Sequence, residues 1–276
     1  IDLTARDVSD IIQRGGTILQ TARCQTMRTE EGQQKAAAIC KELGIETLIV
    51  IGGDGSFTGA KNLSKYGVNV IGLPGTIDLD IAYTDYTIGF DTAVNTAMEA
   101  IDRLRETSNS HERCSVVEVM GRSAGYIALW CGIANGAEQI LIPEKFDNNY
   151  DKLIEEIKNN RASGMTHQII VNAEGIGHSY GLAKKIEEAT GIETRATILG
   201  HLQRGGSPTA RDRVYASVMG AYAIDCIEKG KKNRLIGYKE GHVYDVDIEE
   251  AFQMTKSIDD YEYEVAGILG TRCEYK

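Results

Sequence analysis

The ten residues TLIVIGGDGS, at positions 47–56, place an apolar, β-branched run directly before a glycine-rich turn. A run with so few polar positions is typical of a strand buried on both faces of a parallel sheet. The glycines of the turn allow the backbone to approach a ligand closely. If a helix follows, its N-terminus directs backbone N–H groups at an anion such as phosphate. This stretch therefore predicts an α/β fold with a candidate binding site at a strand end.

The same arrangement recurs further along the chain. Apolar runs at 68–73, 115–120 and 168–173 each lead into a turn that contains glycine and charged residues. Helix-favouring stretches lie at 31–43, 92–106, 150–160, 183–190 and 209–230. Strands that alternate with helices predict parallel α/β layers. Because ligands bind beyond the carboxyl ends of the strands in such sheets, we expect the chemistry to lie in these turns.

The composition is that of an acidic globular protein of 276 residues. Lys and Arg total 30 against 40 Asp and Glu, and the net charge of −10 argues against general binding of nucleic acid or anionic membranes. No apolar run is long enough to span a membrane. The six cysteines are scattered without a CxxC pair, so we expect reduced thiols of a cytoplasmic protein rather than a disulfide framework or a zinc site.

Acidic residues in two of the turns are candidates for chemistry. Asp54 could hold Mg²⁺, although the turn matches neither a Walker A loop nor a dinucleotide fingerprint. Asp78 and Asp80 alternate on a stretch that we expect to be extended, so their side chains should point in similar directions. One carboxylate could then accept a proton from an attacking hydroxyl while the other orients it. On spacing alone, a solvated acidic turn is an equally good interpretation.

Five arginines lie in or near turns rich in Gly, Ser and Thr. They are Arg23, Arg113, Arg122, Arg195 and Arg204. A guanidinium group binds phosphate through two parallel hydrogen bonds, but any single arginine is more often part of a surface ion pair. His201 is equally weak by itself, although beside Arg204 it could bond a sugar hydroxyl. Acids and arginines together suit a metal-bound, multiply phosphorylated ligand.

These motifs resemble the ATP-dependent 6-phosphofructokinases of the bacterial type. The matching stretches are 15–19, 21–24, 52–56, 74–80, 88–93, 110–113, 118–122, 173–175 and 199–208. The resemblance implies two parallel-sheet, Rossmann-like α/β domains with the active site in the cleft between them. It implies a larger nucleotide-binding domain at 1–89 and 207–256. It places a smaller sugar-phosphate-binding domain at 90–206 and 257–276.

The implied reaction transfers the γ-phosphoryl group of ATP to the 1-hydroxyl of fructose 6-phosphate, giving fructose 1,6-bisphosphate and ADP in glycolysis. Asp78 would be the base, assisted by Thr76 and Asp80, while Arg23 and Arg122 would contact the transferring group. The implied ATP-binding residues are Arg23, Cys24, Gly53, Asp54, Gly55 and Ser56, with Asp54 acting on Mg²⁺. The implied sugar-phosphate residues are Thr76, Asp78, Asp80, Arg113, Met120, Gly121, Arg122, Glu174, Arg195, His201 and Arg204.

The resemblance also implies self-association and a phosphoryl donor. Arg113 and Arg195 would reach into a neighbouring subunit's site, as in a homotetramer. In the relatives that use pyrophosphate, an acidic residue stands at the position of Gly55 and a lysine at that of Gly75. Because glycine at position 55 leaves space for a nucleotide, the sequence favours ATP.

Three departures from the family pattern carry expectations. The family's N-terminal strand and its glycine-rich turn have no counterpart, so we expect a chain truncated at its N-terminus. Leu79 stands where the family usually has Asn, which could alter the loop. Arg105, Glu138 and His167 match residues that bind an activating nucleotide, but Ser163 and Met165 replace two phosphate-binding cations. We therefore expect weak allosteric control by a nucleotide.

Two other functions fit part of the sequence. NAD-type and lipid-type kinases share the Gly-Gly-Asp-Gly turn at 52–55, but the motifs at 120–122 and 201–206 belong to sugar-phosphate binding and have no reason to occur there. A catalytically weak, nucleotide-sensing regulatory homologue is the other possibility, which Leu79 and the missing first turn suggest.

Overall fold

The computed structural model describes residues 2–270. Residues 271–276, which end the expected sugar-phosphate domain and include Cys273, lie outside the described residues. The chain divides into two compact units. Unit 1 comprises Ile1–Ile77, Ile81–Asp91 and Gly205–Lys256, and unit 2 comprises Asp78–Asp80, Thr92–Arg204 and Ser257–Lys276. The short segment that carries Asp78 and Asp80 thus belongs to unit 2, although the residues on both sides of it belong to unit 1.

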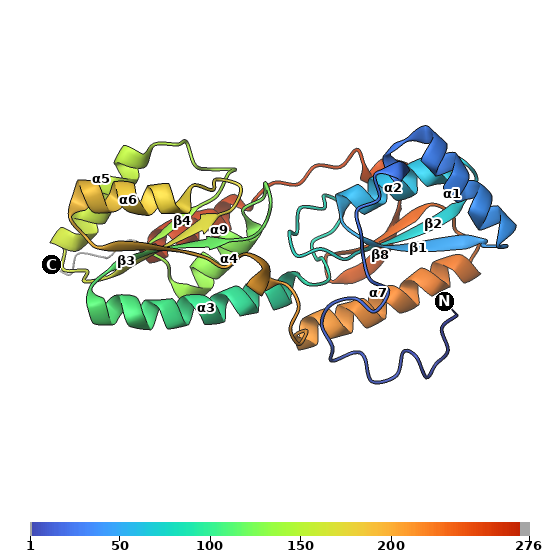
Figure 1. The fold of residues 1–276 in the computed structure, drawn as a ribbon, viewed down its shortest axis with the longest axis horizontal. Coiled ribbons are helices and arrows are strands. Elements are labelled where there is room, and N and C mark those ends of the chain that lie inside the picture. The colour runs from blue at the N-terminus through green and yellow to red at the C-terminus, as the bar shows by residue number, and fades with distance from the viewer. Residues whose placement is uncertain (1, 271–276) are drawn as a thin grey trace. The chain divides into compact units, whose positions relative to one another are not determined.

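Unit 1 contains a four-stranded sheet in the order β1-β2-β7-β8. The strands are β1 (Thr47–Gly52), β2 (Asn69–Pro74), β7 (Arg234–Lys239) and β8 (His242–Asp247). The first three are parallel, and β8 returns antiparallel beside β7. The helical segments are η1 (Thr26–Arg28), α1 (Glu30–Glu42), α2 (Asp54–Ser64), α7 (Ala210–Glu228) and α8 (Ile248–Ala251). Figure 1 shows α1 and α2 on one face of this sheet and α7 on the other.

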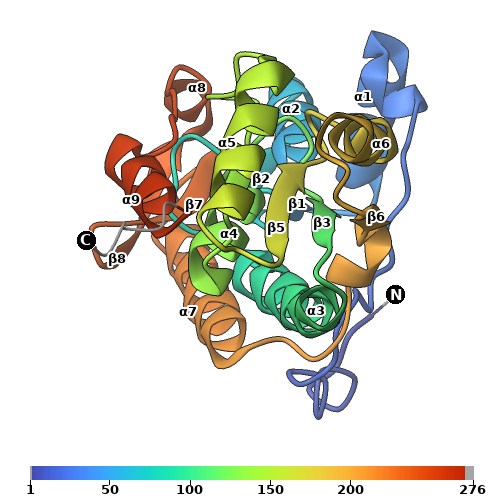
Figure 2. The same ribbon diagram turned by 90° about the vertical axis from the view of Figure 1, so that its left-hand side faces the viewer.

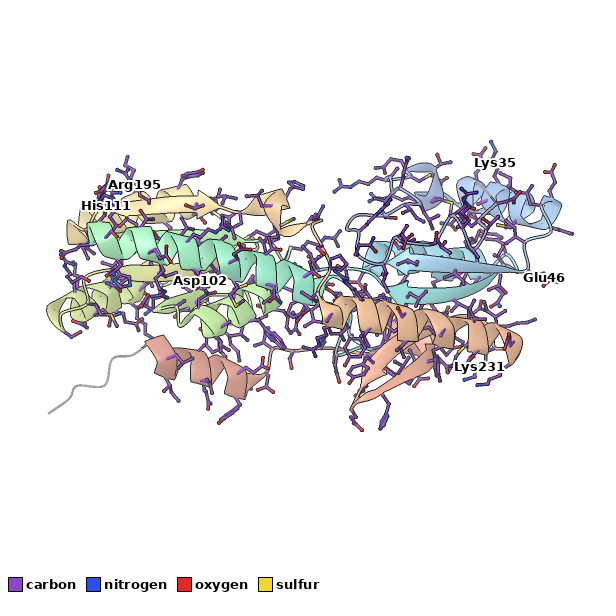
Figure 3. All side chains as sticks on the ribbon, turned by 90° about the horizontal axis from the view of Figure 1, so that it is seen from below. Lys35, Glu46, Asp102, His111, Arg195 and Lys231 are labelled. Atoms are coloured by element: carbon purple, nitrogen blue, oxygen red, sulfur yellow. The ribbon has the colours of Figure 1, made fainter. Side chains whose placement is uncertain are left out.

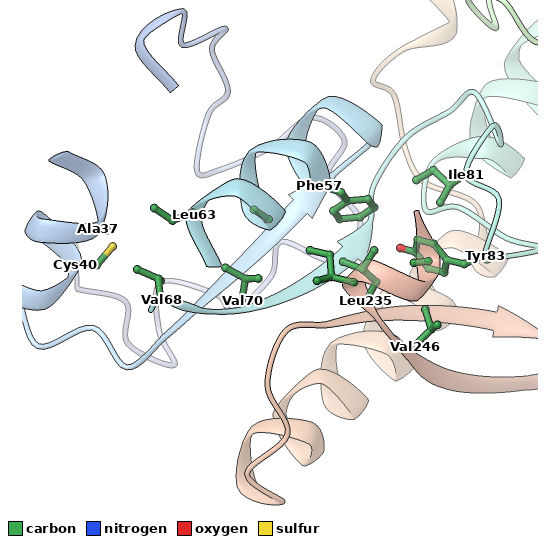
Figure 4. Packing of buried hydrophobic residues seen from close by; sticks show 13 residues of the cluster. Ala37, Cys40, Phe57, Leu63, Val68, Val70, Ile81, Tyr83, Leu235 and Val246 are labelled. Carbon is green, nitrogen blue, oxygen red and sulfur yellow. The ribbon is translucent and has the colours of Figure 1, made fainter. Parts of the chain in front are cut away.

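The core of unit 1 depends on one close approach between a helix and the sheet. Phe57, at the start of α2, is 1% exposed and packs with Ile81, Tyr83 and Leu235, as Figure 4 shows. A Cβ atom at Gly72 in β2 would lie only 2.4 Å from Leu235 Cδ2 and 2.7 Å from the Phe57 ring. Since real Cβ atoms do not come so close to their neighbours, only glycine at position 72 admits both side chains.

Unit 2 contains a second four-stranded sheet, in the order β4-β5-β3-β6, and all three of its strand pairs are parallel. The strands are β3 (Cys114–Val119), β4 (Gln139–Leu141), β5 (Gln168–Ala173) and β6 (Thr194–Ile198). The helical segments are α3 (Phe90–His111), α4 (Tyr126–Asn135), α5 (Tyr150–Ala162), α6 (Ser179–Thr190), η2 (Gly200–Gln203) and α9 (Asp260–Gly270). Figures 1 and 2 show α5 and α6 on one face of the sheet and α3 and α4 on the other.

The prediction of parallel α/β layers is confirmed, and the four apolar runs form β1, β2, β3 and β5. The prediction that the run at 47–51 is buried on both faces is wrong. Within the described residues β1 is an edge strand, and Ile51 is 61% exposed. None of the described helices is both long and apolar enough to cross a membrane. Cys24 is exposed, Cys40, Cys114, Cys131 and Cys226 are buried, and all five are free thiols.

Candidate active site

The glycine-rich turn of unit 1 leads directly into a helix. Gly53 is the N-cap of α2, and its carbonyl accepts hydrogen bonds from the N–H groups of Ser56 (2.9 Å) and Phe57 (3.1 Å). The N-terminus of a helix carries a partial positive charge, so the start of α2 favours an anion. Asp54 and Gly55 are exposed in this first turn. A Cβ atom added at Gly55 would meet nothing within 4 Å, so the space outside the turn is open.

The second turn of unit 1 lies beside the first. Gly52 and Pro74 are register partners at the ends of β1 and β2, and Gly75 N donates to Gly52 O at 3.0 Å. A Cβ atom at Gly53 would lie 3.5 Å from Cβ of Thr76. Thr76 is therefore adjacent to the start of α2.

Magnesium is the metal that the sequence predicts. The described residues suit an Mg²⁺ ion that is held by one carboxylate and by the phosphates of a bound nucleotide. No group of three or more His, Cys, Asp or Glu side chains within residues 2–270 could hold a metal ion. Mg²⁺ in phosphoryl-transfer sites is held by one or two carboxylates together with substrate phosphates, not by an all-protein cage. A single exposed carboxylate, Asp54, in the first turn of a helix suits an ion that arrives on a nucleotide.

A carboxylate and a guanidinium group meet in unit 2. Asp78 is 5% exposed, and its Oδ2 lies 3.6 Å from Nε of Arg122, whose side chain is 63% exposed. Arg122 follows the carboxyl end of β3, with φ of 54°, and the preceding Gly121 has φ of 144°. These left-handed conformations turn the chain sharply after the strand and bring the guanidinium group to the carboxylate.

The prediction that residues 78–80 are extended is wrong. Leu79 has φ of 57°, a left-handed conformation that is unfavourable for leucine, and its side chain is 5% exposed. Asparagine adopts this conformation more easily, which gives a physical reason for the family's usual residue there. Burial of the Leu79 side chain offsets the backbone cost. Asp78 and Asp80 therefore do not alternate along a strand.

Glu174 fixes the turn that carries Arg122. Its Oε1 accepts hydrogen bonds from Gly121 N (3.2 Å) and Arg122 N (2.5 Å). The strands that precede these residues are register neighbours, since Val119 pairs with Ala173. The predicted site residues Met120, Gly121, Arg122 and Glu174 thus lie at one edge of the sheet of unit 2.

Gln203 is a residue of this edge that the sequence did not predict. It is 1% exposed, and its Oε1 accepts a hydrogen bond from Met120 N at 2.8 Å. Gln203 ends η2, the short helix that contains His201, and Arg204 is its C-cap. His201 and Arg204, which the sequence predicted as site residues, are both exposed. The buried amide of Gln203 thereby ties the segment of His201 and Arg204 to the segment of Met120.

Tyr126, the first residue of α4, lies near Asp80 and was not singled out from the sequence. Burial raises the pKa of its hydroxyl to about 12, and the negative charges of Glu144 and Asp80 add to the effect. The hydroxyl therefore stays protonated at neutral pH and can act as a hydrogen-bond donor near Asp80. Because a tyrosine at the start of an apolar helix suggests core packing, no sequence signal separated it from the other buried aromatic residues.

Arg113 and Arg195 lie at the opposite end of the same sheet. Arg113 immediately precedes β3, and Arg195 is the second residue of β6. The five or six residues of these strands span roughly 15–20 Å. Both arginines form ion pairs with Glu193, and Figure 3 shows Arg195 at the same end of unit 2 as His111. The structure therefore does not bring them together with Arg122.

Other predicted residues lie elsewhere. Arg23 and Cys24 are exposed in the segment of unit 1 that precedes η1. Arg105 and Glu138, the predicted effector residues, form an ion pair at 3.2 Å, and Arg105 also donates to the carbonyls of Asn135 and Gly136. Their charges are thus engaged with each other and with the backbone. The third effector residue, His167, is partly buried just before β5.

Comparison with known proteins identifies relatives over most of the chain. The family described as "Phosphofructokinase" matches residues 1–227. The "ATP-dependent 6-phosphofructokinase" of Clostridium botulinum (strain Loch Maree / Type A3) is 58% identical over 268 residues, covering 97% of this chain and 84% of that protein. "ATP-dependent 6-phosphofructokinase 1" of Clostridium perfringens (strain 13 / Type A) is 59% identical over 265 residues, covering 96% and 82%.

Solved structures agree with these sequence relatives. The Pichia pastoris phosphofructokinase, in a crystal structure of its T-state, superposes with a TM-score of 0.85 at 33% sequence identity. The match covers 91% of this chain and 30% of the much longer yeast chain. The similarity therefore extends through both units.

Proposed function

The chain belongs to the phosphofructokinase family, and on that premise we propose that it transfers the γ-phosphoryl group of ATP to the 1-hydroxyl of fructose 6-phosphate. The products are fructose 1,6-bisphosphate and ADP, in a step of glycolysis. The observation that carries the proposal is the buried Asp78 carboxylate beside the exposed Arg122 guanidinium, at 3.6 Å. Phosphoryl transfer needs positioning and charge neutralisation more than covalent chemistry from the protein.

Asp78 is the general base of the proposed reaction. As the 1-hydroxyl oxygen forms its bond to the γ-phosphorus, the bond from that phosphorus to the bridging oxygen of ADP breaks. The hydroxyl proton passes to the Asp78 carboxylate, with Thr76 and Asp80 assisting. Arg122 neutralises the charge on the transferring group from the sugar side and Arg23 from the ATP side. The residues of unit 2 that hold the sugar phosphate in this proposal are Met120, Gly121, Glu174, His201 and Arg204.

Unit 1 binds the nucleotide in this proposal. The open first turn of α2 binds phosphate oxygens. Gly53, Gly55, Ser56 and Cys24 contribute to the ATP site. Asp54 would hold Mg²⁺, which would supply charge neutralisation on the phosphates. The expected boundaries, 1–89 with 207–256 for the nucleotide domain and 90–206 with 257–276 for the sugar-phosphate domain, are part of this proposal.

Self-association completes the sugar-phosphate site. Arg113 and Arg195 lie at the end of the sheet opposite to Arg122, so they are badly placed to serve the site of their own chain. We infer that they bind the sugar phosphate of a neighbouring subunit, in a homotetramer. A cytoplasmic location suits a glycolytic enzyme with free thiols.

The decisive test is the reaction itself. The purified protein, supplied with ATP, Mg²⁺ and fructose 6-phosphate, should form ADP and fructose 1,6-bisphosphate, and omission of the sugar phosphate should abolish ADP formation. Pyrophosphate in place of ATP should give little product. Absence of sugar-dependent ADP formation would reject the proposal and favour a regulatory homologue.

A further inference from the structure

Two strands of unit 2 begin side by side at the end of the sheet away from Arg122. Cys114 of β3 and Thr194 of β6 are register partners, and Cys114 N donates to Glu193 O at 3.0 Å. Both partners are buried, with exposed fractions of 0% and 4%. The residues immediately before them, Arg113 and Glu193, are therefore held at fixed positions by the sheet.

Glu193 makes ion pairs with two arginines at once. Its Oε2 lies 2.7 Å from Nε of Arg113, and its Oε1 accepts a hydrogen bond from Nη2 of Arg195 at 2.5 Å. Arg113, and to a lesser extent Arg195, lowers the pKa of the Glu193 carboxyl, which keeps it ionised at neutral pH. Each oxygen of one carboxylate thus serves a different guanidinium group.

The carboxylate of Glu193 reduces the repulsion between the two guanidinium groups. Two guanidinium groups that bind one phosphate must lie close together, where their charges repel each other. A carboxylate between them offsets the repulsion and restricts two long side chains that would otherwise lose rotamer freedom on binding. Each arginine uses one nitrogen for Glu193, so its other N–H groups remain available to an anion. The three side chains together keep a net charge of +1.

We propose that Glu193 is a positioning residue, which holds Arg113 and Arg195 as a preformed pair for the phosphate of the sugar substrate. The inference rests on the proposed function, because it assumes that the two arginines bind that phosphate. Glu193 does not touch the substrate itself; it sets the geometry of the groups that do.

The exposure of these three side chains distinguishes a role in substrate binding from a role in the stability of the fold. The side chains of Arg113, Glu193 and Arg195 are 31%, 37% and 64% exposed. Ion pairs as exposed as these contribute little to the free energy of unfolding. Loss of the Glu193 charge should therefore appear in substrate binding and not in stability.

The primary variant is Glu193→Gln, which keeps the size of the side chain and removes its charge. We expect KM for fructose 6-phosphate to rise roughly 5- to 30-fold, since ion pairs with Glu193 orient both arginines. KM for ATP, the melting temperature and the oligomer size by light scattering should stay unchanged. Glu188→Gln is the matched control, because Glu188 is 68% exposed and its partner is Lys184 at 3.7 Å; it should leave all four quantities unchanged. An unchanged or lower KM for the sugar phosphate in Glu193→Gln would overturn the inference.

Variants of the two arginines separate the role proposed for Glu193 from the role proposed for Arg113 and Arg195. Arg195→Ala should raise KM for the sugar phosphate, and Glu193→Gln added to it should raise KM by less than it does in the wild-type chain. If Arg195→Ala and Arg113→Ala leave KM unchanged, the proposed role of the arginines is wrong. If either raises KM while Glu193→Gln has no effect, the role of Glu193 alone is wrong. Calorimetric titration with fructose 6-phosphate gives the same comparison without turnover.

Discussion

Arg122 places its Nε 3.6 Å from Oδ2 of Asp78, so an exposed guanidinium group borders a buried carboxylate within unit 2. The Arg122 backbone is fixed independently, because its N–H donates to Glu174 Oε1 at 2.5 Å. The guanidinium group can therefore bind a phosphoryl oxygen while the carboxylate stays in place. The proposed base and the proposed charge-stabilising group are thus neighbours, as proton abstraction coupled to phosphoryl transfer requires.

Asp78→Asn removes the proposed base and keeps the shape of the side chain. We expect kcat to fall roughly 10²- to 10⁴-fold with a modest change in KM, as the loss of a general base does. Steady-state kinetics with both substrates varied provides the measurement. Asp151→Asn is the control, since Asp151 is 92% exposed on the surface of the same unit. Turnover near the wild-type rate in Asp78→Asn would assign the base elsewhere.

Gly55→Asp tests the nucleotide site of unit 1. The structure leaves the space around Gly55 open, and an acidic residue in the first turn of a helix is favourable, so the variant should fold. Its carboxylate would enter the space proposed for the nucleotide phosphates and repel them, so KM for ATP should rise about tenfold or more. Gly59→Asp, at another open position of α2, is the matched control. Equal KM values for ATP in the two variants would exclude Gly55 from the nucleotide site.

Local pattern predicted the strands that the sheets bury most deeply. β2, β3 and β5 are mostly apolar and almost completely buried. β6 was missed because its sequence, TRATI, is polar and half-exposed, and β4 because it has only three residues. The hairpin of β7 and β8 was missed because its partly exposed strands carry many polar and charged residues. Its antiparallel pairing is also outside the βα alternation that the motifs predicted.

Contacts between distant segments limited the prediction of the site. Asp78 and Arg122 were found because each lies in a recognisable motif, although nothing in their spacing indicates that they meet. The bond from Met120 N to Gln203 Oε1 joins positions 83 residues apart, and no local pattern marks Gln203 as its acceptor. The left-handed backbone of Leu79 was unpredictable for another reason, because tertiary burial there overrides the preference of leucine.

ADP should have little effect on the response to fructose 6-phosphate. Arg105 and Glu138 already form an ion pair with each other, and Ser163 and Met165 supply no cation for a phosphate. We expect the half-saturating concentration of fructose 6-phosphate to change less than about twofold with saturating ADP, whereas allosteric couplings typically reach 5-fold or more. The measurement is a saturation curve with and without ADP at a constant, high ATP concentration. A shift of five-fold or more would show that this chain binds an effector through other groups.

Asp245 should make the stability of unit 1 depend on pH. Its side chain is 4% exposed; burial opposes its ionisation, but hydrogen bonds from Lys231, Arg234 and Tyr222 together lower its pKa to about 2. Because this pKa lies below that of an unfolded chain, the ionised group stabilises the fold above about pH 4 and loses that contribution as the pH falls toward 2.

Asp245→Asn should lower the free energy of unfolding at pH 7 by about 2–4 kcal/mol, because it leaves two cations without their buried partner. Urea denaturation of both proteins between pH 7 and pH 2.5 provides the measurement, and the difference between them should shrink in the acid range. Asp225→Asn is the control, since Asp225 is 56% exposed and its partner Lys229 is 4.0 Å away; it should change the free energy by less than about 0.5 kcal/mol. A difference for Asp245→Asn that stays constant down to pH 2.5 would mean that packing around residue 245, and not the charge of its carboxylate, stabilises the hairpin of β7 and β8.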